Sequence, residues 1–205
     1  LYAHIASPDV HVREDLQQIV MYYHGQGEGR QFTRAALSQD GIHFEGREEE
    51  LGPHYFRVIE HEGFFYAMSM PGYLYRSPDG LSRFEAGSQF FNADMRHSAL
   101  LIRDGLLYVF FTQRGDAPER ILLSTLDLTG DWNTWTQSEA IEILRPETDW
   151  EGASLSIEPS RGGYIDVRAN QLRDPAIYQE GGNTYLLYSV AGESGIAIAE
   201  LHFTN

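Results

Sequence analysis

The segment ALSQDGIHFEG at positions 36–46 returns as YRSPDGLSRFEAG at positions 75–87. Both copies contain Ser-x-Asp-Gly followed by Phe-Glu, and Asp40 and Asp79 are 39 residues apart. A repeat of about 20–50 residues is typical of solenoids and propellers. Asp-Gly between two alternating strands also favours a hairpin, because both central residues of a tight primed turn need positive φ. Each copy is therefore expected to form the outer hairpin of a repeated β unit.

Inner hairpins are predicted upstream of these outer ones and again further along the chain. In the first, SPDVHV pairs with QIVMYYHG at 18–25, and later hairpins turn at Glu62-Gly63, at Asp104-Gly105 and near Gly181-Gly182. Their strands are rich in Val, Ile, Leu, Tyr and Phe, and no helical periodicity of any length is present, which indicates an all-β protein.

Four units of three or four short strands favour a β-propeller. We predict one β-propeller domain over residues 1–205, with a long loop at 145–169. The blades are expected at roughly 5–50, 54–92, 96–144 and 170–205. A β-sandwich is the structural alternative, but it does not explain the repeated Ser-x-Asp-Gly register.

The amino-acid composition and charge restrict the kinds of binding partner that are expected. The 205 residues are 42% hydrophobic and 13% aromatic, which is enough for a substantial core. Thirty acidic against fifteen basic residues give a formal charge of −15, and the basic residues form no run or stripe, so nucleic acid is not expected as a partner. An acidic surface with many aromatic residues suits a carbohydrate ligand, although solubility alone also explains the charge.

The chain contains no cysteine, which excludes disulfides and thiolate chemistry. No stretch approaches the roughly 18 apolar residues of a membrane span, so no membrane partner is expected. The first residues lack the features of a signal peptide, and the compartment stays open between the cytoplasm and export with a signal outside this chain.

The ends of the chain bear on how the propeller closes. There is no initiator Met, and the last unit ends after its third strand, so either the closure is unusual or a further blade precedes Leu1. Incomplete closure would leave exposed strand edges, for which we predict a homodimer.

Several segments together carry a family resemblance: SPDV before IVMYYHG, the SxDGxxF hairpins, STLDLTGDWNTW at 124–135, and LRDPAIYQEGGNTYLLYSVAGESGIAIAEL at 172–201. This pattern resembles the five-bladed β-propeller glycosidases of the arabinanase, β-xylosidase and invertase clan. The resemblance implies a glycoside hydrolase that acts on a plant- or microbe-derived oligo- or polysaccharide. It also implies an axial funnel to which the first strands of different blades contribute carboxylates.

Glycosidic cleavage needs one carboxylic acid that protonates the leaving oxygen and a second carboxylate that acts as base or nucleophile. Within the resemblance, Asp9 or an aspartate upstream of this chain is expected to be the base and Asp174 the carboxylate that tunes the acid. Glu151 is expected to be the acid, because the neighbouring Trp150 indole would desolvate it and raise its pKa. The structural alternatives are turn-capping roles for Asp9 and Asp174 and a solvated surface charge for Glu151.

The predicted substrate-binding residues are Tyr55, Arg57, Arg96, His97, Trp150 and Arg173. His97 is assigned to ligand contact rather than to a metal, and neither a metal nor a cofactor is expected. Asp116, Glu119 and Arg120 form a second candidate cluster, for which a surface salt-bridge group is favoured over a substrate-contacting loop.

The chain also departs from the clan pattern. Asp174 follows Glu151, whereas the clan's Arg-Asp-Pro aspartate precedes its acid, and no Asp-Pro motif stands upstream of Asp174. A non-catalytic carbohydrate-binding propeller therefore remains as the alternative. A sialidase-like protein is disfavoured, because its Asp-box has one more residue between Asp and Gly and a Trp where this chain has Phe.

Overall fold

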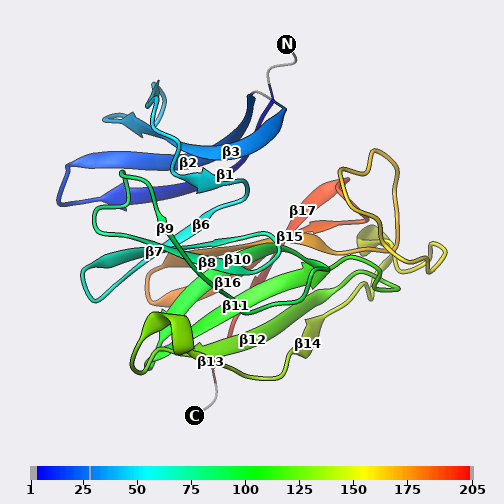
Figure 1. Ribbon diagram of the computed structural model, residues 1–205. Coiled ribbons are helices and arrows are strands. Elements are labelled where there is room, and N and C mark those ends of the chain that lie inside the picture. The colour runs from blue at the N-terminus through cyan, green and yellow to red at the C-terminus, as the bar shows by residue number, and fades with distance from the viewer. Residues whose placement is uncertain (1–3, 28, 204–205) are drawn as a thin grey trace. The chain divides into compact units, whose positions relative to one another are not determined.

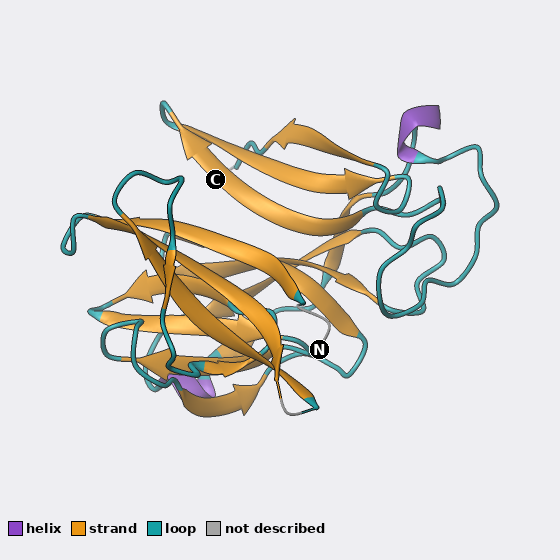
Figure 2. Ribbon diagram, turned by 90° about the horizontal axis from the view of Figure 1, so that it is seen from above, coloured by secondary structure: helices purple, strands orange, loops and turns teal. Residues whose placement is uncertain are grey.

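The computed structural model describes residues 4–27 and 29–203. The chain divides into two compact units, unit 1 (Leu1–Phe90) and unit 2 (Phe91–Asn205). Strands dominate the described residues, whose helical turns are η1 (Trp132–Thr134) and η2 (Asp149–Glu151) (Figure 2). In these same ranges no helix has the length and apolar character needed to cross a membrane.

Unit 1 contains two antiparallel sheets whose strands follow the order of the chain (Figure 1). The first sheet consists of β1 (Ile5–Arg13), β2 (Gln18–Gly27), β3 (Arg30–Ser38) and β4 (Glu45–Gly46), with β5 (Gly52–Pro53) paired to β3. The second consists of β6 (Arg57–His61), β7 (Phe64–Ser69), β8 (Tyr73–Ser77) and β9 (Glu85–Gln89). Such up-and-down meanders are the building blocks of propeller blades.

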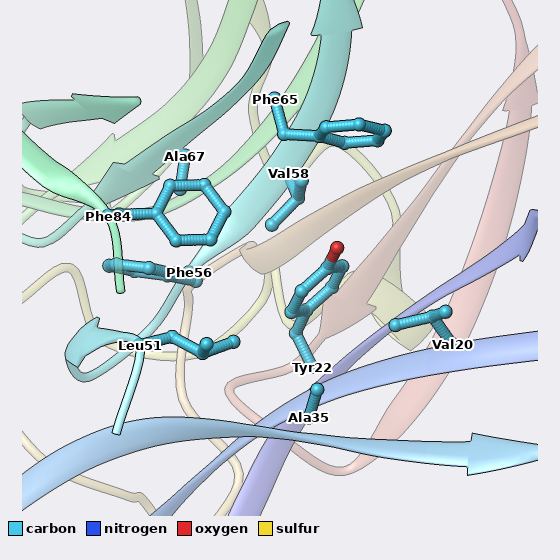
Figure 3. Packing of buried hydrophobic residues seen from close by; sticks show 9 residues of the cluster. All are labelled: Val20, Tyr22, Ala35, Leu51, Phe56, Val58, Phe65, Ala67 and Phe84. Carbon is cyan, nitrogen blue, oxygen red and sulfur yellow. The ribbon is translucent and has the colours of Figure 1, made fainter. Parts of the chain in front are cut away.

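The core of unit 1 lies where these two sheets face one another (Figure 3). Val20, Tyr22 and Ala35 come from the first sheet, and Val58 and Ala67 from the second. The remaining members of the cluster are Leu51, Phe56, Phe65 and Phe84. In β2 every second residue is buried, as the period-2 pattern of the sequence predicts, whereas β3 and β7 also bury consecutive residues.

Unit 2 contains a five-stranded and a three-stranded antiparallel sheet. The first consists of β10 (Met95–Arg103), β11 (Leu106–Gln113), β12 (Ile121–Asp127) and β13 (Thr136–Gln137), with β14 (Ile141–Leu144) paired to β12. The second consists of β15 (Arg173–Glu180), β16 (Asn183–Val190) and β17 (Gly195–Glu200). Leu101, Phe110 and Leu186 belong to one buried cluster to which both sheets contribute.

The inner hairpins turn where the sequence predicts. The three two-residue turns have positive φ at both central positions: Glu62 (49°) and Gly63 (76°), Asp104 (52°) and Gly105 (78°), and Gly181 (59°) and Gly182 (86°). This is the backbone of a tight primed turn, whose twist matches that of the flanking strands.

The Ser-x-Asp-Gly loops are built differently from the expectation. They do connect outer strands, β3 to β4 and β8 to β9, but only the glycine of each has positive φ. In the second copy the Ser77 hydroxyl accepts hydrogen bonds from the amides of Asp79 and Gly80, and Asp79 Oδ1 accepts from the amides of Leu81 and Ser82. The first copy repeats these bonds. Side-chain capping, and not a primed turn, therefore shapes the repeat.

The prediction of an all-β fold with four blades is confirmed. Each of the four sheets has its first strand followed directly by an antiparallel partner, and these first strands carry most of the residues predicted for the site.

Candidate functional site

Three of the four first strands are interrupted by a β-bulge. The pairing register shifts between Ala6 and Asp9 in β1, between Met95 and Ser98 in β10, and between Arg173 and Ala176 in β15. Bulges redirect side chains and are over-represented next to active sites. The bulges of unit 2 enclose Arg96-His97 and Asp174-Pro175, so this irregularity places three of the residues that the sequence singles out.

Asp174 is held in an unfavourable backbone conformation. Its φ is +48° although it is not glycine and precedes a proline, and such strain is typical of functional positions. Its side chain is 33% exposed, Nδ1 of His97 forms an ion pair with Oδ1, and the Ser189 hydroxyl donates to Oδ2 over 3.3 Å. Burial opposes ionisation, but the hydrogen bond and charge of His97 and the charge of Arg96 outweigh it and lower the pKa of Asp174.

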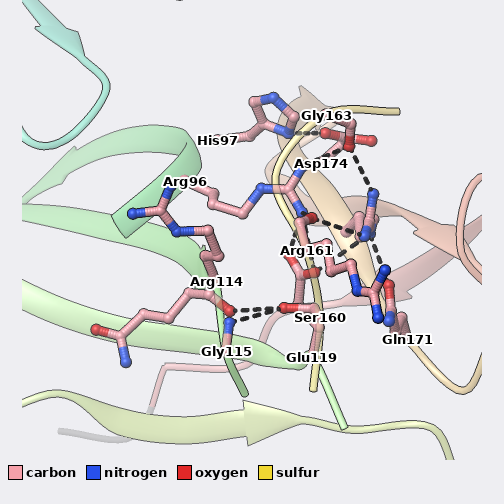
Figure 4. Close-up of polar contacts among 12 residues, drawn as sticks. Arg96, His97, Arg114, Gly115, Glu119, Ser160, Arg161, Gly163, Gln171 and Asp174 are labelled. Atoms are coloured by element: carbon pink, nitrogen blue, oxygen red, sulfur yellow. Dashed lines mark hydrogen bonds and ion pairs between the residues drawn. The ribbon is translucent and has the colours of Figure 1, made fainter. Parts of the chain in front are cut away.

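Arg96, Glu119 and Arg173 form a buried triad, of which Figure 4 labels Arg96 and Glu119 next to His97 and Asp174. Nη1 of Arg96 lies 3.2 and 3.0 Å from the two carboxylate oxygens of Glu119, and Nε of Arg173 lies 3.2 Å from Oε2. The three residues are 4%, 0% and 2% exposed. Glu193 pairs with Nη1 of Arg173 at 2.9 Å, so two carboxylates balance the two guanidinium groups.

The two arginines of the triad hold the long loop against the sheets of unit 2. Both donate to the carbonyl oxygens of Arg161 and Gly163, over 3.1 and 3.2 Å from Arg96 and over 3.4 and 3.1 Å from Arg173. Arg173 also donates to the Gln171 side chain. Most of their N–H groups are therefore used inside the protein, which gives Arg96 and Arg173 a positioning role beside the substrate-binding role that the sequence predicts.

Glu151 is buried, as the sequence predicts, but its carboxylate is engaged within the loop. Oε2 accepts hydrogen bonds of 3.0 Å from the amides of Glu147 and Thr148 and from the Thr148 hydroxyl, and Oε1 accepts from the Tyr188 hydroxyl at 3.2 Å. The neighbouring Trp150 is 54% exposed, whereas Glu151 is 4% exposed. Four donors aimed at one carboxylate leave little room for the proton that a general acid carries. This geometry gives Glu151 a structural role in closing η2, and its catalytic role stays a prediction.

The other predicted residues lie in unit 1. Asp9 Oδ2 accepts from the Val58 amide at 2.7 Å and pairs with His11 Nε2 at 2.8 Å, so it ties β1 to β6. Burial opposes ionisation of Asp9, but His11, Arg57 and the Val58 amide lower its pKa. Nη1 of Arg57 donates to the carbonyl oxygens of residues 7 and 56.

Tyr55 belongs to an aromatic cluster in the same unit. It has φ of +63°, and its ring centroid lies 4.3 Å from that of His24 and 5.0 Å from that of His54. The structure therefore places the predicted residues in three groups: Asp9 with Arg57 near Tyr55, Arg96 with His97, Arg173 and Asp174, and Trp150 with Glu151.

Glu119 is the residue whose position the sequence missed. Its neighbours Asp116 and Arg120 form the expected salt bridge at 3.3 Å, and Arg120 pairs with Glu142 at 2.7 Å. Burial raises the pKa of Asp116, while the charge of Arg120 opposes this. Glu119 itself is not a surface residue, because its backbone bridges to Gln171 and its side chain enters the triad. Its sequence signal is weak: an acidic residue just before the apolar run of β12.

Among residues 4–27 and 29–203, no group of three or more His, Asp or Glu side chains is arranged to hold a metal ion.

Comparison with known proteins identifies the fold. No protein-family model matches the chain. It is 37% identical over 217 aligned residues to "Uncharacterized protein R118" of Acanthamoeba polyphaga mimivirus, an alignment that covers 96% of this chain. The chain spans 61% of the length of that relative.

Solved structures match over nearly the whole chain. The α-L-arabinanase of Cellvibrio cellulosa superposes with a TM-score of 0.64 at 14% identity, covering 98% of this chain and 75% of the arabinanase. A thermostable family-43 glycoside hydrolase gives 0.66 at 17% identity, with 97% and 70% covered. A glycosyl hydrolase from Bacteroides ovatus gives 0.69 at 12% identity, with 96% and 64% covered.

The chain thus has the β-propeller fold of the glycoside hydrolases, and the resemblance inferred from its motifs is confirmed at the level of the fold. The described residues form four blades, so the predicted five-bladed type of propeller is not confirmed.

Proposed function

We propose that this protein is a glycoside hydrolase that acts on an oligo- or polysaccharide of plant or microbial origin. The observation that carries the proposal is Asp174, an ionised and partly exposed carboxylate on a strained bulge, paired with His97. A carboxylate that stays charged next to the sugar serves as base or nucleophile, or stabilises the positive charge of an oxocarbenium-like transition state. The fold supports the proposal, because the structures it resembles are glycoside hydrolases.

The roles of the remaining carboxylates belong to the same proposal. Asp9 in unit 1 is an ionised carboxylate with 19% of its side chain exposed, which suits a base. Glu151 is assigned the role of acid, with Trp150 beside it. In this assignment Asp174 tunes the acid, and His97 orients Asp174 through their shared contact.

One observation favours a second candidate, a propeller that binds carbohydrate without cleaving it. Every oxygen of the Glu151 carboxylate already accepts a hydrogen bond from the protein. If no other group protonates the leaving oxygen, Asp174 and its arginine neighbours would hold a saccharide through hydrogen bonds alone.

The test combines a thermal-shift screen with hydrolysis assays on oligomers of arabinose, xylose, fructose, galactose and galacturonic acid. A ligand that binds only the folded state must raise its melting temperature. The variant is Asp174→Asn, and the matched control is Asp104→Asn, because the side chain of Asp104 is 74% exposed in the β10–β11 turn.

We expect wild type and Asp104→Asn to release reducing sugar from one oligomer class, and folded Asp174→Asn to lose at least about 100-fold in rate. A thermal shift without hydrolysis in the wild type would favour the binding candidate. Unchanged hydrolysis by Asp174→Asn would remove Asp174 from the mechanism, and no shift with any sugar would overturn both candidates.

A further inference from the structure

A cavity of about 490 Å³ lies within unit 2, between the long loop and the start of β15. Its wall runs from Leu155 to Ala169 along the loop and reaches Arg173 of the buried triad. Pockets of about 300–1,000 Å³ are the usual size for small-molecule ligands. The cavity adjoins the residue that precedes Asp174 but is formed mainly by a segment to which the proposed mechanism assigns no ligand contact.

The charge of the cavity is opposite to that of the chain. Arg161, Arg168 and Arg173 line it, with one lining carboxylate, Glu158. Glu119 and Glu193 already neutralise Arg173, so the net positive charge comes from Arg161 and Arg168. The whole chain carries a formal charge of −15. A local excess of guanidinium groups on an acidic protein favours an anion at this position against the field of the rest of the molecule.

Two of these arginines retain donors for a ligand. Arg161 and Arg168 are both exposed. Arg168 donates from Nη2 to the carbonyl oxygen of Asp149 at 2.9 Å, and within the described part of the chain the Arg161 guanidinium makes no hydrogen bond or ion pair. A guanidinium presents a planar fork of donors that matches the two oxygens of a carboxylate.

The cavity wall also offers contacts suited to a sugar. Asn170 is 4% exposed, and its amide group donates to the carbonyl oxygens of Ala153 and Leu155. Its Oδ1 is buried and, among the described residues, accepts no hydrogen bond, so it is an acceptor that a hydroxyl group would satisfy. Tyr164, which is 83% exposed, provides an aromatic face at the same cavity.

We propose that this cavity is a subsite for a saccharide that carries a carboxylate, that is, a uronic acid unit held by Arg161 and Arg168. The inference rests on the proposed function in that the ligand is a saccharide, and it narrows the substrate class from saccharides in general to acidic saccharides. The triad contributes by fixing the carbonyl groups of residues 161 and 163, which sets the position of the loop that carries Arg161.

The experiment measures binding of oligogalacturonate and of the matched neutral galactose oligomer by calorimetry, at low and high NaCl. The variants are Arg161→Gln, Arg168→Gln and Glu158→Gln, with Arg103→Gln as control because Arg103 lies in the β10–β11 hairpin, outside the cavity. We expect each cavity arginine substitution to weaken oligogalacturonate binding about tenfold. Glu158→Gln should strengthen it about twofold to fivefold, because a like charge is removed, and high salt should reduce the preference for the acidic sugar.

The outcomes separate this inference from the proposed function. Tighter binding of oligogalacturonate with opposite effects of Arg161→Gln and Glu158→Gln supports the subsite, whether or not the sugar is cleaved. Binding of the neutral oligomer with no preference for the acidic one overturns the subsite and leaves the proposed function intact. Acidic-sugar binding that none of the cavity substitutions changes also overturns it. Binding of neither sugar overturns the subsite, and the proposed function is then decided by the screen with the other oligomers.

Discussion

Replacing Glu119 by glutamine tests whether the buried triad stabilises unit 2. The substitution keeps the size of the side chain and removes the charge that Arg96 and Arg173 share at 3.0–3.2 Å. Removing one partner of a buried ion pair costs about 3–5 kcal/mol, because the remaining charge is left buried. Gln retains one acceptor oxygen and Arg173 keeps its pair with Glu193, so we expect the lower end, about 3 kcal/mol. For a chain of this size, that corresponds to a fall in melting temperature of about 6–12 °C.

The assay is urea unfolding followed by tryptophan fluorescence. All three tryptophans, Trp132, Trp135 and Trp150, lie in unit 2, so the signal reports the unit that contains the triad. The control is Glu200→Gln, whose side chain is 45% exposed and which should change the free energy of unfolding by less than about 0.5 kcal/mol. A loss of less than about 1 kcal/mol in Glu119→Gln, with unchanged dependence on urea, would refute the conclusion that the triad is buried and mutually paired.

Three further predictions concern both units. Gly80→Ala should destabilise unit 1 by about 1–3 kcal/mol more than Gly63→Ala in circular-dichroism melts. Both glycines have φ above +70°, but a Cβ added at Gly80 would lie 2.8 Å from Tyr22 Oη, whereas a Cβ added at Gly63 would meet nothing within 4 Å. Equal losses of stability would contradict this crowding. Glu151→Gln should lower the free energy of unfolding of unit 2 by about 1–2 kcal/mol, whereas unchanged stability with lost hydrolysis would make this residue the acid. Burial of Asp79 opposes ionisation, but hydrogen bonds from the backbone amides of Ser82 and Leu81 lower its pKa to about 2. Its stabilisation is therefore present above about pH 4 and lost as the pH falls through 2. The difference in stability between wild type and Asp79→Asn should shrink over that range, and a constant difference would argue against the capped loop.

The buried positions of the charged residues could not be predicted from the sequence. Glu119 lies in the polar segment RGDAPER and has the local character of a surface residue, yet it is fully buried. Its partners come from other strands, Arg96 from β10 and Arg173 from β15, and the residues next to Glu119 in the sequence do not predict these contacts. Arg161 and Asn170 were missed for the same reason, because their cavity exists only once the loop is held by the triad.

Sequence alone determined the strands, the inner turns and the number of blades. Each depends on neighbouring residues: alternation sets which face of a strand is buried, and turns such as Asp104-Gly105 contain residues that tolerate positive φ. Tertiary structure alone decided which polar groups are buried and what they bind, as the contrast between the exposed Trp150 and the buried Glu151 shows. The physical reason is that a backbone preference is set by local sterics, whereas desolvation and ion pairing depend on which distant strands stack together.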